Sequence, residues 1–235
     1  MATVHDGHRE RVKRRFLTSG LSDFEPHNAL ELILFYSIPR KDTNELAHRL
    51  IDYFGSYDKV FEAEYEQLLD VKGMTPNTAA HIKLLLESYR YYEQQKDKKN
   101  FVVTSGDTAK KYCVSCFVGE TTEKCFMLCF NSKLKLINSV LVSSGTVDRT
   151  AMSMRKIVEI ATVQKAVSVI LTHNHPDGFA LPSANDLATT RSAMKALAII
   201  GVELNDHIIV AGKNAISLAT EGIIANMRKE LGFNG

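Results

Sequence analysis

Two histidines and an aspartate lie close together in the sequence, at a spacing that suits a metal ion. His173 and His175 are separated by one residue, and Asp186 ends the stretch HNHPDGFALPSAND. Residues two apart in an extended chain point to the same side, so both imidazoles can reach one point in space. Two nitrogens and one carboxylate, with a fourth position left for water, are typical of a catalytic zinc site, whereas structural zinc sites have four protein ligands. The residue types therefore predict one catalytic zinc ion per chain.

The segments around these residues are of the kinds that would position them. The run AVSVIL, residues 166–171, is apolar and rich in β-branched residues, which predicts a buried strand leading to the histidines. The prolines and glycine of 176–182 predict a loop. Ser183 has the chemistry of a helix N-cap and Asp186 falls in the first turn. An ordinary capping box is the alternative role for this pair, and the combination with a histidine pair after a buried strand favours the metal.

The pattern HxHP followed by PSxxD, from His173 to Asp186, resembles the signature of the JAMM (MPN+) metalloproteases. The form HNHPxGxxxPSxxD resembles the bacterial RadC branch of that family, and the resemblance covers nearly the whole chain. It implies an α/β fold in which an N-terminal all-α helical domain precedes a three-layer, cytidine-deaminase-like (MPN) domain with a mixed sheet. It also implies a metal-dependent, peptidase-like hydrolase, and the RadC name carries an association with DNA repair.

The resemblance implies two further site residues. The JAMM signature has a glutamate on an early strand, and Glu123, which opens the apolar segment EKCFMLCF, matches it by register; Glu120 is the competing candidate. Spacing alone favours a solvated strand end for Glu123. If Glu123 corresponds to the glutamate of the JAMM signature, the resemblance implies that it acts as general base toward a zinc-activated water. Ser183 is expected to donate a hydrogen bond to the oxyanion that forms from the attacked carbonyl.

A third histidine lies in the segment DHIIV, residues 206–210, which resembles a short motif of RadC relatives. His207 is a candidate to orient a metal ligand through a hydrogen bond. An ordinary core or turn histidine is the alternative, and the residue pattern alone favours it.

The rest of residues 100–235 alternates between strand and helix patterns. We expect a short strand at 101–104, a helix from 105 to 117, a hairpin of strands at 123–130 and 135–143, a helix that Ser153 caps and that ends near 164, a helix at 184–200, and strands at 202–210 and 215–218. This order predicts a three-layer α/β domain with a mixed, mostly antiparallel sheet.

Composition and charge exclude several classes of protein. The chain has 235 residues, of which 45% are hydrophobic and 24% charged, as expected for a globular protein of one or two domains. No stretch reaches the roughly 20 apolar residues of a membrane span, so no membrane contact is expected. The N-terminus lacks the apolar segment of a secretory signal. With a net charge of +2, neither half has the basic excess of a dedicated nucleic-acid binder.

The four cysteines are expected to be buried small side chains. Cys113 and Cys116 form a single C-x-x-C without the second pair that a structural zinc site needs. Cys125 and Cys129 alternate with other apolar residues in a predicted strand. In a chain without a secretory signal, free cysteines indicate a reducing, cytoplasmic setting without disulfides.

Residues 1–99 carry helical patterns, and we expect them to form a helical, helix-hairpin-helix-like domain. The charged stretch KDKKN, residues 96–100, contains no apolar residue and predicts the boundary to a hydrolase domain of residues 100–235.

The segment VKGMTP, followed by a helix, resembles a helix-hairpin-helix motif. In that motif a glycine-rich hairpin lets main-chain N–H groups approach a DNA phosphate. Lys72, Gly73 and Thr75 are therefore the candidate DNA contacts. The family pattern has a second glycine where Thr75 stands, which counts against close approach of a phosphate. A plain helical packing module is the alternative.

Together these patterns predict a zinc-dependent hydrolase of the metallopeptidase or isopeptidase type. It would cleave a protein or peptide substrate by metal-activated water, without a covalent enzyme intermediate. The alternative is a DNA-associated binding module for repair or recombination, in which the metal domain is a scaffold.

Overall fold

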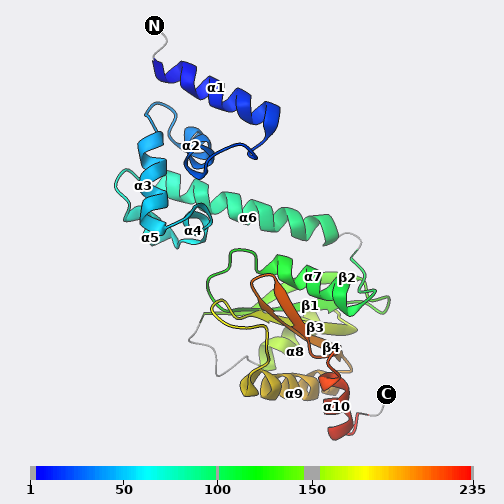
Figure 1. Ribbon diagram of the computed structural model, residues 1–235. Helices are drawn as coiled ribbons and strands as arrows, with labels where there is room; N and C mark the ends of the chain where they lie inside the picture. The colour runs from blue at the N-terminus through cyan, green and yellow to red at the C-terminus, as the bar shows by residue number, and fades with distance from the viewer. Residues whose placement is uncertain (1–3, 99–100, 146–153, 234–235) are drawn as a thin grey trace. The chain divides into compact units, whose positions relative to one another are not determined.

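The computed structural model describes residues 4–98, 101–145 and 154–233 (Figure 1). The chain divides into two compact units, Met1–Tyr89 and Arg90–Gly235. The first is helical and the second is an α/β unit with a mixed sheet, so the predicted fold class is confirmed. The division falls within a long helix. The boundary between residues 99 and 100 stays a prediction, because both residues lie outside the described ranges.

Five helices and the start of a sixth form the first unit. They are α1 (Val4–Ser19), α2 (Pro26–Ser37), α3 (Asn44–Phe54), α4 (Tyr57–Glu62), α5 (Tyr65–Leu69) and α6 (Pro76–Lys98). Pro26 occupies the first turn of α2, where its missing N–H costs no hydrogen bond. Gly55 ends α3 with a φ of 90°, a conformation that glycine adopts without steric cost. The helices enclose a core in which Leu30, Leu50 and Ile82 are fully buried.

A five-stranded sheet is the centre of the second unit. Its elements are α7 (Gly106–Cys116), β1 (Lys124–Phe130), β2 (Leu136–Ser144), α8 (Met154–Val163), β3 (Ser168–Asn174), α9 (Ala184–Ile199), β4 (Glu203–Ala211), β5 (Asn214–Ser217) and α10 (Ile223–Glu230). The strand order is β2-β1-β3-β4-β5. Among the strands that the structure describes, β3 and β4 pair in parallel, with α9 as the crossover between them, and the other pairs are antiparallel.

The sheet is covered by helices on both faces, which gives the three predicted layers. Figure 1 shows α7 on one face of the sheet and α8 and α9 on the other. Every residue of β3 is buried. Val169 and Leu171 belong to the core under α8 and α9, while Ile170 belongs to the core under α7. Because strand residues alternate between faces, His173 lies on the same face as Leu171 and faces the layer of α9.

One sequence expectation outside the site is contradicted by the structure, and another falls on a residue that the structure does not describe. The strand expected at 101–104 is wrong, because only Val102 forms an isolated bridge, to Lys135. Phe101 is buried instead by stacking on Tyr112 of α7, with ring centroids 4.4 Å apart. The expected N-cap Ser153 lies outside the described residues.

All four cysteines are buried and free of disulfides, as predicted. Burial raises the pKa of the Cys116 and Cys125 thiols to about 12, so neither is a thiolate near neutral pH. Among the residues that the structure describes, no helix combines the length and the apolar character needed to cross a membrane.

The buried central strand gives a test of stability. Leu171 is fully buried, and Leu171→Ala is expected to lower the free energy of unfolding by about 2–5 kcal/mol through lost burial and a cavity. Ile199→Ala is the control, because Ile199 is 85% exposed and its truncation should change the same quantity by less than about 0.5 kcal/mol. Urea denaturation followed by circular dichroism measures both. Equal losses for the two variants would contradict the central position of β3.

Candidate metal centre

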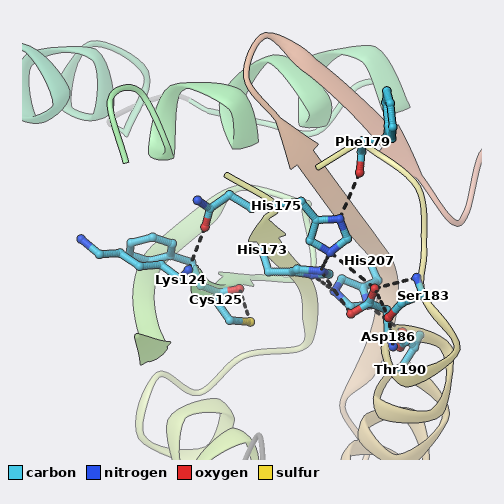
Figure 2. A network of polar contacts seen from close by, with 11 residues as sticks. Lys124, Cys125, His173, His175, Phe179, Ser183, Asp186, Thr190 and His207 are labelled. Carbon is cyan, nitrogen blue, oxygen red and sulfur yellow. Dashed lines mark hydrogen bonds and ion pairs between the residues drawn. The ribbon is translucent and has the colours of Figure 1, made fainter. Parts of the chain in front are cut away.

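The three side chains that the sequence singles out converge at the C-terminal end of β3. His173 lies on the strand, His175 follows it, and Asp186 lies in the first turn of α9. The Nε2 atom of His173 is 2.9 Å from Nε2 of His175 and 3.2 Å from Oδ1 of Asp186. The His175 Nε2 to Asp186 Oδ2 distance is 3.6 Å. Figure 2 shows the three groups pointing toward one another. The structure therefore brings all three candidate ligands together.

The spacing of these two nitrogens and of the Asp186 carboxylate suits a small divalent cation. Zinc binds nitrogen and oxygen ligands at about 2.0–2.2 Å, so ligand atoms of a tetrahedral site lie roughly 3.3 Å apart. The distances of 2.9 to 3.6 Å found here lie on both sides of that value. Within the described ranges, no other group of three or more His, Cys, Asp or Glu side chains gathers its ligand atoms as closely.

Hydrogen bonds behind His173 determine which of its nitrogens carries the hydrogen. The Thr190 hydroxyl donates to the main-chain carbonyl of Asp186 at 2.6 Å, so it must accept from His207 Nδ1, which is also 2.6 Å away. Burial lowers the pKa of His207 to about 3, so this ring is neutral and its Nε2 has no hydrogen. His207 Nε2 then accepts from His173 Nδ1 at 2.9 Å. In neutral His173, Nε2 therefore presents a lone pair to the centre of the site.

His175 is held in the same tautomer by the main chain. Its Nδ1 lies 3.0 Å from the carbonyl oxygen of Phe179, which can only accept, so Nδ1 carries the hydrogen. The Nε2 atoms of neutral His173 and His175 consequently face each other as two acceptors. Such a contact is repulsive unless a proton or a metal ion lies between the atoms. A carboxylate oxygen on the third corner favours a metal ion, because one proton bridges only two of the three atoms.

Asp186 is fixed as a carboxylate by the start of α9. Ser183 donates to Asp186 Oδ2 from both its N–H and its hydroxyl, each at 2.7 Å, and accepts from the Asp186 N–H at 3.1 Å. The pair thus forms the capping box that the sequence offered as an alternative. Burial raises the pKa of the Asp186 carboxyl, but the hydrogen bond and charge that His173 supplies when its ring is protonated, together with the bonds from Ser183, outweigh it. The resulting pKa lies well below the usual range.

Glu123 lies immediately before β1 and lines two adjoining hollows in the surface. One is a cavity of about 40 Å³ that His173, Asp186 and His207 also line, which has room for about one water molecule. The other is an open groove of about 460 Å³ lined by His175 and the residues that follow it. Glu123 is half-buried and therefore stands where a substrate groove would meet the candidate ligands.

The competing glutamate is occupied elsewhere. Glu120 forms ion pairs with Arg90 and Lys124, each at 2.6 Å, and its side chain is only 9% exposed. It lines neither of the two hollows. Because both Glu120 oxygens are engaged by cations and the residue lines neither hollow, the geometry favours Glu123 over Glu120.

The candidate DNA contacts lie together in the first unit. Lys72, Gly73 and Thr75 line a cavity of about 550 Å³, together with Arg40 and Lys41. Gly73 has a φ of 100°, so the hairpin requires glycine there. The hydroxyl of Thr75 accepts a hydrogen bond from the Thr78 N–H at 3.2 Å and so caps α6.

The sequence did not point to Thr190. This residue lies four positions after Asp186, and Ser or Thr at that spacing in a helix can donate a hydrogen bond back to the earlier carbonyl. That spacing is common in helices and does not indicate which other side chain the hydroxyl contacts. The contact with His207 depends on the parallel pairing of β3 with β4, which the sequence alone did not show.

Comparisons with known proteins show the family of the chain. Residues 103–223 match the family model described as "RadC-like JAB domain". A UPF0758 protein of Fusobacterium nucleatum subsp. nucleatum is 34% identical over 94% of this chain and 98% of its own length. A UPF0758 protein of Ruegeria pomeroyi is 32% identical over 92% of this chain and 97% of its own length. The chain therefore belongs to the RadC family.

Proposed function

We propose that this protein is a zinc-dependent hydrolase of the metallopeptidase or isopeptidase type, with His173, His175 and Asp186 as metal ligands and Glu123 as general base. The observation that carries the proposal is the convergence of two imidazole nitrogens, 2.9 Å apart, with the Asp186 carboxylate, whose Oδ1 lies 3.2 Å from His173 and whose Oδ2 lies 3.6 Å from His175; none of these atoms carries a proton when the rings are neutral. Membership of a family with a JAB domain supports it. The free thiols suit a cytoplasmic setting, which is part of the proposal.

The residues of the site would divide the work of hydrolysis. Zinc bound there would polarise a water molecule and lower its pKa toward about 7. Glu123, which lines the same cavity as His173, would take a proton from this water and deliver it to the leaving amine. Ser183 would donate a hydrogen bond to the carbonyl oxygen as it gains negative charge. For that its hydroxyl must turn away from Asp186 Oδ2, where it donates in the present arrangement.

Substitutions separate the ligands from the base. Wild type is expected to contain one metal ion per chain, with zinc preferred, and His173→Ala should lose it. Glu123→Gln should keep the metal and lose turnover by about 10²- to 10⁴-fold, because only proton transfer is removed. Elemental analysis measures the metal, and a library of internally quenched peptides measures turnover.

Glu120→Gln is the matched control for this test, since it makes the same change three residues away in the ion-paired glutamate. It should retain both metal and turnover. Loss of turnover in Glu120→Gln, with full turnover in Glu123→Gln, would show that the wrong glutamate has been assigned. Full metal content in His173→Ala would remove His173 from the ligand set.

The hydrogen bond that His207 donates to Thr190 yields a second test. Thr190→Val keeps the shape of the side chain but removes the hydroxyl that fixes the His207 tautomer, and zinc affinity should fall by about 10- to 100-fold. Thr190→Ser keeps the hydroxyl and should restore most of the affinity. Competition with a chromogenic chelator measures both. Equal affinities in Thr190→Val and wild type would contradict the orienting role of His207.

A second candidate function is DNA binding by the first unit, as in a repair or recombination module. The supporting observation is the cavity that brings Lys72 and Gly73 together with Arg40 and Lys41. Two features weaken it. Asp42 and Glu45 line the same cavity, and Arg49 is already engaged by the Lys72 carbonyl and Glu45.

A salt titration decides on this second function. If the cavity contacts phosphates, affinity for duplex, single-stranded or branched DNA should fall steeply with salt, with a slope that drops by about 1 in Lys72→Ala. Lys59→Ala is the control, because Lys59 is an exposed lysine of the same unit outside the cavity. No binding at low salt would exclude the function.

A further inference from the structure

A buried asparagine stands between the two candidate histidine ligands. Asn174 is 3% exposed and ends β3. Its side-chain oxygen accepts a hydrogen bond from the Lys124 N–H at 2.7 Å, and its side-chain nitrogen donates to the Thr122 carbonyl at 3.0 Å. Both ends of the amide are therefore satisfied by the main chain of one short segment.

The residue between those two main-chain groups is Glu123. The antiparallel ladder of β1 and β3 ends with the pair Cys125 and His173, so no ladder bond holds the chain at Glu123 to β3. On both sides of Glu123, hydrogen bonds of the Asn174 side chain take the place of the ladder bonds. A third bond, from the Gly145 N–H to the Glu123 carbonyl at 2.8 Å, also holds the main chain at this residue.

The hydrogen bonds of Asn174 thus link Glu123 to the strand that carries His173. We propose that Asn174 is the positioning residue for Glu123, holding its carboxylate at a fixed place relative to the candidate metal ligands. This inference rests on the proposed function, and it deepens it by assigning a role to the residue between the two histidines. Misplacing a reacting group by about 1 Å can cost on the order of 100-fold in rate. Two hydrogen bonds that fix the position of Glu123 relative to the candidate ligands therefore matter for turnover.

Asn174→Ala tests the proposal through three measurements. Hydrogen exchange of the Lys124 amide, followed by NMR, should become at least about tenfold faster because its acceptor is gone. Metal affinity should stay within about threefold of wild type, because the ligands remain. With the best quenched peptide, kcat should fall about 10- to 100-fold while KM stays unchanged. In a Glu123→Gln background the same substitution should have no further effect on kcat.

The chain offers a matched control. Asn131 makes a comparable contact at the other end of β1, where its side-chain oxygen accepts from the N–H groups of Lys133 and Lys135. Asn131→Ala should leave kcat, metal affinity and Lys124 exchange unchanged. If Asn174→Ala does not fold, Asn174→Asp replaces it; this variant keeps the acceptor for Lys124 and loses the donor to Thr122, so kcat should fall with metal retained.

Two results would overturn the proposal. One is a loss of metal affinity by the same factor as kcat, which would mean that Asn174 acts on the histidine strand. The other is an unchanged Lys124 exchange rate. If wild type binds no metal and cleaves no peptide, the proposed function fails, and the exchange rate still decides whether Asn174 holds this segment.

Discussion

The structure of the site follows from one electrostatic constraint, the meeting of three acceptor atoms in a small space. When both rings are neutral, the Nε2 atoms of His173 and His175 face each other at 2.9 Å and an Asp186 oxygen lies 3.2 Å from the first of them, so a proton or a metal ion is needed to offset the repulsion. Each atom is kept there by a contact made behind it, from His207, from the Phe179 carbonyl and from the Ser183 cap. The fold thus holds these acceptor atoms in a place where they repel one another and where a bound cation would offset the repulsion.

These supporting contacts come from three elements that meet only because β3 is central in the sheet. The strand pairs with β1 on one side and β4 on the other. The pairing with β1 brings Glu123, which precedes β1, close to the end of β3, and the pairing with β4 brings His207 beside it. The crossover helix α9 contributes Asp186 and Thr190 one turn apart. A strand buried on both faces resists displacement, so the groups that it carries stay fixed relative to one another.

The sequence predicted the parts of this arrangement that are local. His173, His175 and Asp186 lie within one strand, loop and helix start, and their spacing was enough to expect convergence. Glu123 lies just before another strand, β1, and came only from the family resemblance. The partners of His207 could not be predicted, because they depend on which strands pair in parallel. The strand expected at 101–104 was wrong in extent, since main-chain hydrogen bonds to residues 134–136 form only one bridge, at Val102. The ring of Phe101 is buried by stacking on a helix, and periodicity cannot distinguish such burial from burial within a sheet.

The orientation of His175 by a carbonyl oxygen has an evolutionary consequence. The main chain of Phe179 makes this contact, and its side chain is 81% exposed, like that of Leu181 at 61%. Any amino acid supplies the same carbonyl, so the identity of these two exposed side chains is uncoupled from the geometry of the imidazole. The loop beside the histidines is thereby open to diversification among relatives, and new surface chemistry could arise there while the ring stays in place.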